Sequence, residues 1–131
     1  MIDHISIVVK DFVRSRDFYD KALAPLGYTR LMEFPNTAGY GANGMPAFWI
    51  GAGPPSFWRE GHAPSHAPIH VALSAKSEDE VRAFHAAALA AGGTDFGAPG
   101  QRAKYHPGYY GAFVLDPDGN NVEAVIHHHK P

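Results

Sequence analysis

Two histidines and one glutamate, far apart in the chain, are the residues whose types could support metal chemistry. His4 and His70 lie in strand-like runs, "HISIVV" and "HVALS", and Glu123 interrupts a third apolar run, "NVEAVI". A carboxylate inside an apolar strand is costly unless it is paired, hydrogen-bonded or bound to a metal. Two imidazoles and a carboxylate form a suitable ligand set for a divalent ion. The elements that carry these residues decide whether they meet.

An internal repeat places the two histidines at equivalent positions. When the sequence is shifted by 66 residues, identical residues coincide: His4 with His70, Arg16 with Arg82, Phe18 with Phe84 and Gly27 with Gly93. Taken alone, either histidine could be an ordinary strand residue, and Glu123 could be a charge that protects an edge strand. The repeat favours a shared role, because one offset holds across a strand and a helix.

Each copy is predicted to fold as βαβββ. Apolar alternation predicts strands, and apolar residues three and four apart predict helices. The pattern Ser77-Glu78-Asp79-Glu80 is typical of a helix start. In copy one the strands are expected at 2–9, 28–33, 38–41 and 46–51 and the helix at 12–24; in copy two the strands are expected at 69–74, 94–96, 111–115 and 121–126. This is an α+β domain over 1–131, with module 1 (about 1–52), a Gly- and Pro-rich linker (about 53–67) and module 2 (about 68–127). If the two sheets form one curved surface, His4, His70 and Glu123 can converge on it.

Composition narrows the function classes. A chain of 131 residues, 45% of them hydrophobic, suits one compact domain, and a net charge of −2 disfavours nucleic-acid binding. The absence of cysteine excludes disulfides and thiolate metal sites. We expect a cytoplasmic protein without a membrane span or signal peptide. The cluster His127-His128-His129 is interpreted as a solvated tail that can collect metal in vitro.

Four segments resemble the vicinal oxygen chelate superfamily, also called the glyoxalase/bleomycin-resistance/dioxygenase fold. They are "MIDHISIVV", "SRDFYDKALAPLGY", "PIHVALSA" and "GAFVLDPDGNNVEAVIH". The resemblance implies a cupped mixed sheet of paired βαβββ modules around a metal, with helices on the outer face. It implies ligands at His4, His70 and Glu123, and a fourth position in the last strand of copy one. It also implies a homodimer, with the site formed within one chain or across two.

The fourth ligand position departs from the family's pattern. Alignment of "GMPAFWIGAG" with "GNNVEAVIHH" places Phe48 opposite Glu123. The glyoxalase I type has a glutamate there, so lactoylglutathione lyase activity is disfavoured. Three protein ligands leave positions open for water and substrate. The pattern is similar to the fosfomycin-resistance transferases and, more loosely, the extradiol dioxygenases, and Ser6 matches a hydroxyl that helps at the active site of the transferases.

The segment "QRAKYHPGYYGAF" is the expected source of the remaining site residues. A base is needed for proton transfer, and His106, Tyr109 and Tyr110 are the candidates. The two tyrosines could instead be ordinary strand aromatics. Arg102 and Lys104 are candidates for holding an anionic substrate.

The leading hypothesis is an enzyme that depends on one divalent metal ion (Fe, Mn, Zn or Ni). It would act on a small oxygen-rich substrate as a lyase, isomerase, thiol transferase or dioxygenase. The alternative is a metal-free binding protein that sequesters a hydrophobic or drug-like ligand in the same cup. A purely structural dimer module would explain the fold but not the ligands, because fold alone does not fix function.

Overall fold

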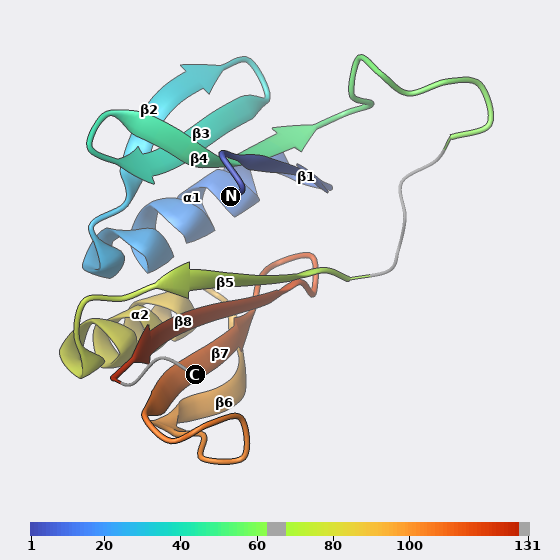
Figure 1. The fold of residues 1–131 in the computed structure, drawn as a ribbon. Helices are drawn as coiled ribbons and strands as arrows, with labels where there is room; N and C mark the ends of the chain where they lie inside the picture. Colours follow the sequence, from blue (N-terminus) through green and yellow to red (C-terminus); the bar gives the residue numbers. More distant parts are fainter. Residues whose placement is uncertain (63–67, 129–131) are drawn as a thin grey trace.

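The computed structural model describes residues 1–62 and 68–128 and confirms two βαβββ modules (Figure 1). Part of the predicted linker, and His129, lie outside the described residues. Module 1 contains β1 (Ile5–Val9), α1 (Phe12–Leu23), a 3₁₀ turn (Ala24–Leu26), β2 (Thr29–Phe34), β3 (Thr37–Ala42) and β4 (Met45–Ala52). Module 2 contains β5 (His70–Ser74), α2 (Glu78–Ala90), β6 (Thr94–Gln101), β7 (Tyr109–Leu115) and β8 (Asn121–His127).

Each module forms its own four-stranded mixed sheet. The strand orders are β1-β4-β3-β2 and β5-β8-β7-β6, and the first strand of each module pairs in parallel with the last. In the described part of the chain, no ladder joins the two sheets. The edges of β1 and β5 are therefore open, and such edges can pair with another strand.

Local sequence signals explain where the helices begin. The Asp11 carboxylate accepts from the amide of Arg14 at 3.1 Å, and the Ser77 hydroxyl accepts from the amide of Glu80 at 3.1 Å. Both residues satisfy amides that have no partner within their helices. None of the helices in the described residues is long and apolar enough to cross a membrane.

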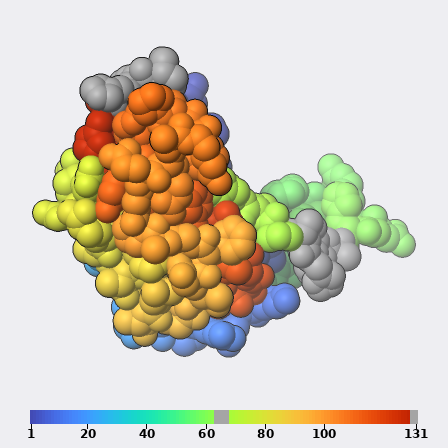
Figure 2. Space-filling view, turned by 90° about the horizontal axis from the view of Figure 1, so that it is seen from below, coloured from blue at the N-terminus to red at the C-terminus, as the bar shows by residue number. Residues whose placement is uncertain are grey.

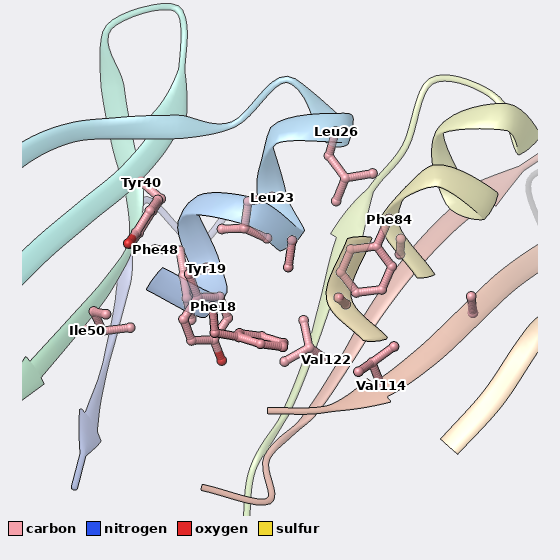
Figure 3. Close-up of a cluster of buried hydrophobic side chains, with 14 of the residues drawn as sticks. Phe18, Tyr19, Leu23, Leu26, Tyr40, Phe48, Ile50, Phe84, Val114 and Val122 are labelled. Atoms are coloured by element: carbon pink, nitrogen blue, oxygen red, sulfur yellow. The ribbon is translucent and has the colours of Figure 1, made fainter. Parts of the chain in front are cut away.

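The two modules share one hydrophobic core, built around the helices (Figure 3). Phe18 of α1 and Phe84 of α2 are fully buried beside Val114 and Val122 of the second sheet. Each helix thus covers one face of its sheet, and the two helices pack against each other between the modules. The opposite faces, which carry the candidate ligands, point away from this core. Figure 2 shows that the segment after β4 projects from the body of the molecule.

The turn before β8 is anchored to module 1. Asp116 is buried, and its carboxylate accepts from the Tyr19 hydroxyl of α1 at 2.5 Å and from the Asn120 amide at 2.8 Å. Burial, followed by the nearby Asp116 charge, raises the pKa of Tyr19 well above its usual value, so the hydroxyl stays a donor. This network fixes the start of the strand that carries Glu123.

Candidate metal centre

Glu123 forms a hydrogen-bonded cluster with His70 and Tyr109. Its side chain is 1% exposed, and its Oε1 lies 3.0 Å from His70 Nε2. The Tyr109 hydroxyl donates to Oε2. A Cβ at Gly111 would lie 3.0 Å from Oε2, so the glycine leaves room for the carboxylate. The buried carboxylate is therefore satisfied by two side chains on one face of the sheet.

The partners of His70 show that this cluster holds a proton. His70 Nδ1 lies 3.1 Å from the carbonyl oxygen of Asn121, which can only accept, so Nδ1 carries hydrogen. The contact between Nε2 and Glu123 needs a second proton, on either the imidazole or the carboxyl. A carbonyl that fixes one ring nitrogen is typical of histidines that bind metal through the other. The cluster thus has the donor chemistry of two metal ligands.

Tyr109 stays protonated in this setting. Burial raises the pKa of its hydroxyl, and the hydrogen bond to Glu123 raises it further. The hydroxyl is therefore a stable donor to the carboxylate. Tyr110, the next residue, points to the opposite face, as neighbours in a strand do. Its hydroxyl accepts from Arg82 of α2 at 2.9 Å, so Tyr110 belongs to the helix side of the sheet and not to the candidate site.

The other histidine of the repeat lies on the open face of module 1. His4 Nδ1 is 2.7 Å from the Asp3 carboxylate. A cavity of about 380 Å³ adjoins it, lined by Asp3, His4, Ser6, Met45, Pro46 and Trp49. Ser6, predicted as a site residue, therefore lies beside His4. The indole of Trp49 lies against the backbone of β3, since a Cβ at Gly39 would come within 2.9 Å of the ring.

The single chain does not bring the three predicted ligands together. Within residues 1–62 and 68–128, no three histidine, cysteine or acidic side chains are close enough to hold one ion. His70 and Glu123 form one half of the predicted ligand set, and His4 belongs to the other. The convergence expected from one continuous curved sheet is thus absent within one chain, because the two sheets are not joined.

The strand register corrects the predicted position of the fourth ligand. Ala72 pairs with Glu123, and its repeat counterpart Ser6 pairs with Trp49. Trp49, not Phe48, is therefore the counterpart of Glu123. Phe48 is 4% exposed and faces the core, where its ring centroid lies 5.0 Å from that of Tyr19. A shift of one residue moves a side chain to the other face, which explains the error.

The cationic candidates differ in their placement. The Arg102 guanidinium lies 5.5 Å from the ring centroid of Phe113, whose ring lies 6.1 Å from that of His70. Arg102 donates to the carbonyl of Ala98 and pairs with no carboxylate among the described residues. The structure thus places Arg102 on the face that carries Glu123. The ammonium of Lys104 lies 5.2 Å from the ring centroid of Tyr105, which is exposed.

His106 lies beside the cluster rather than in it. Its ring packs against that of Tyr109 with a centroid separation of 5.4 Å, and its Nε2 contacts His127. Sequence reasoning missed three contributors: Trp49, Gly111 and Phe113. The alternation of side chains along β7 was the signal that could have assigned Gly111 and Phe113 to the open face, whereas the bulge in β4 hid Trp49.

Paired βαβββ modules, with histidines at their first strands and a glutamate in the last, define a two-module fold of the vicinal oxygen chelate type. Residues 1–124 match the Glyoxalase/Bleomycin resistance protein/Dioxygenase superfamily, and the chain belongs to this superfamily. No curated protein sequence matches the chain.

Solved structures share the fold over nearly the whole chain. A glyoxalase/bleomycin resistance protein from Albidiferax ferrireducens T118 is 29% identical, with a TM-score of 0.72 and 98% of each chain covered. TioX from Micromonospora sp. ML1 is 19% identical, with a TM-score of 0.71, covering 97% of this chain and 98% of that one. A glyoxalase-related enzyme from Fulvimarina pelagi is 22% identical, with a TM-score of 0.68, covering 95% and 86%. The last two likenesses show the fold alone.

Proposed function

We propose that this protein is a divalent-metal-dependent enzyme acting on a small oxygen-rich substrate. The observation that carries the proposal is the buried Glu123 carboxylate, whose Oε1 lies 3.0 Å from His70 Nε2 on an open sheet face. A metal ion would replace the hydrogen between these two atoms, and both side chains are ligands suited to Fe, Mn, Zn or Ni. The ion would polarise substrate oxygens and stabilise a developing anion.

The third ligand would come from His4 of a second copy. His4 does not reach His70 and Glu123 within one chain, and both ligand-bearing faces are open. β1 and β5 are also edge strands with unpaired backbone groups. A homodimer in which module 1 of one copy faces module 2 of the other would bring the two halves of the ligand set together and cover these edges.

The remaining residues of the face have roles that follow from their contacts. Tyr109 holds the Oε2 atom of Glu123, so that Oε1 stays directed at His70. The Arg102 guanidinium would bind an anionic group of the substrate, while an apolar part lies against Phe113. Tyr109 also stays protonated and gives its one hydrogen to Glu123, so its role is to position the carboxylate and not to transfer a proton. The reaction would be that of a lyase, isomerase, thiol transferase or dioxygenase. Lactoylglutathione lyase is disfavoured, because Trp49 holds the place of the extra glutamate.

A metal-free binding protein is the second candidate, and the cavity beside Trp49 favours it. The indole, Met45 and Pro46 give this cavity an apolar wall suited to a hydrophobic ligand. This function would not require the proton-sharing pair in module 2. Metal content therefore separates the two candidates.

A mixing experiment tests the enzyme proposal and the shared site together. In a background that carries His106→Asn and His127→Asn, so that this neighbouring imidazole pair cannot collect metal, we expect about one ion per chain in the parent protein, and none when His4→Ala or Glu123→Ala is added alone. After the two variants are unfolded together, refolded and reloaded, mixed dimers contain one intact site. Metal should return to about one quarter of the parent content, because half of the dimers are mixed.

Each of the other outcomes contradicts a different part of the proposed function. Metal in the single variants would refute the ligand assignment. A failure of the mixture to recover metal, with a parent that binds it, would place the whole site within one chain. A parent that binds no added divalent ion would favour the binding protein.

A further inference from the structure

A second pair of imidazoles lies outside the proposed metal centre. His106 precedes β7, and His127 is the last residue of β8, paired in register with Tyr109. His106 Nε2 lies 2.9 Å from His127 Nδ1, and the ring centroids are 5.1 Å apart at an interplanar angle of 20°. His127 is thus a fixed part of the sheet, and the interpretation of it as tail does not hold.

The hydrogen bonds of the pair assign its protons. His106 Nδ1 lies 2.7 Å from the carbonyl oxygen of Pro107, so Nδ1 carries hydrogen and Nε2 has a free lone pair in the neutral ring. His127 Nδ1 must then donate to it. A backbone carbonyl bound to one ring nitrogen orients histidine for metal binding through the other. The pair therefore presents one ready ligand, and a second that becomes ready when the proton of His127 moves from Nδ1 to Nε2.

The pair is held in place from one side. The Tyr109 ring lies edge-on to both imidazoles, with centroid separations of 5.4 Å to His106 and 5.0 Å to His127. His128, the next residue, turns away and its Nε2 lies 2.7 Å from the Glu78 carboxylate. The two neighbouring histidines thus have different partners, which gives a matched control.

From this geometry we propose that His106 and His127 bind a Cu²⁺, Ni²⁺ or Zn²⁺ ion, separately from the centre at His70 and Glu123. For metal–nitrogen bonds of about 2.0–2.1 Å, two ligands at right angles lie about 2.9 Å apart. The present separation fits such a pair, once the exposed His127 ring swings so that both lone pairs aim at one point. Neutral imidazoles without a carboxylate select these ions over Mg²⁺ and Ca²⁺. Water, or an oxygen ligand from solution, would complete the coordination.

Titration with Cu²⁺ tests the site in the full chain without an added tag. Glu123→Gln serves as the background, so that the proposed catalytic centre does not contribute. Visible absorption and electron paramagnetic resonance report the number of bound ions and nitrogen ligands. We expect about one Cu²⁺ per chain with two nitrogen ligands, and binding about tenfold or more weaker in His106→Asn and in His127→Asn. His128→Asn should bind like the background protein.

Two outcomes would overturn the site. If His128→Asn weakens binding as much as His127→Asn, the ion is collected by the histidine run and is adventitious. If His106→Asn has no effect, the pair is not the ligand set. Unchanged circular dichroism in each variant verifies that the fold is kept. Neither outcome bears on the catalytic centre, because Glu123 is already replaced.

Discussion

A carboxylate introduced into β4 tests whether Trp49 or Phe48 is the counterpart of Glu123, as the strand register decides. Trp49→Glu would place the new group on the open face, at the counterpart of Glu123. It should act as a fourth ligand and tighten metal binding by about tenfold or more. The loss of the half-buried indole should cost little stability by comparison.

Phe48→Glu is the matched control, one residue away. Phe48 is 4% exposed and packs against Tyr19 in the shared core. Removing a buried aromatic ring costs about 3–5 kcal/mol, and burying an unpaired charge adds to this. For a domain of this size the midpoint of thermal unfolding should fall by roughly 10–20 °C or more, with no gain in metal affinity.

The two variants are compared by thermal unfolding and by titration with the metal that the parent binds. The register predicts opposite results: tighter metal binding with a stable fold for Trp49→Glu, and lost stability for Phe48→Glu. A folded Phe48→Glu protein with tighter metal binding would refute the register. It would restore the alignment that places Phe48 opposite Glu123.

Three further predictions follow from the hydrogen-bond networks. Metal loading at neutral pH should release about one proton per site, since the ion replaces the proton shared by the imidazole and Glu123; calorimetry in buffers of different ionisation enthalpy measures this, and zero release would contradict the shared proton. Tyr109→Phe should weaken metal binding by about 10–100-fold by removing the donor that orients the carboxylate, while Tyr110→Phe should leave it unchanged; equal effects would mean that neither hydroxyl orients the site. Tyr19→Phe should destabilise the fold by about 1–3 kcal/mol in urea unfolding, because buried Asp116 loses a donor, and an unchanged midpoint would contradict that role.

The fold could be predicted largely from the sequence, because repeat and periodicity agree. The offset between His4 and His70 identified two equivalent modules, and the capping pattern at Ser77 marked the start of α2. Strand ends were less accurate. β6 continues to Gln101, beyond the predicted 94–96, because it pairs with β7 across register shifts that no local pattern reveals.

The candidate site was only partly predictable, for two physical reasons. Register depends on which backbone groups pair across strands, and a bulge between Tyr40 and Gly41 in the pairing of β3 with β4 shifts the register of β4 by one residue. An alignment that omits this shift assigns core-facing side chains to the open face of the sheet. Phe48 was assigned to the open face in this way. Tyr109 and Tyr110 illustrate the same point: composition marks both as candidates, and only their pairing decides which one reaches Glu123.

The separation of the ligands into two halves has a consequence for stability. If His4 of one copy and Glu123 of another bind the same ion, the ion binds the dimer and not the separated chains. Binding of a ligand to only one state stabilises that state by mass action, by about 2.7 kcal/mol at a free concentration 100 times the dissociation constant. Metal would then hold the dimer together as well as supply its chemistry. The proton shared by His70 and Glu123 gives this coupling a pH dependence, because acid competes with the ion for both ligands and would loosen the dimer as it displaces the metal.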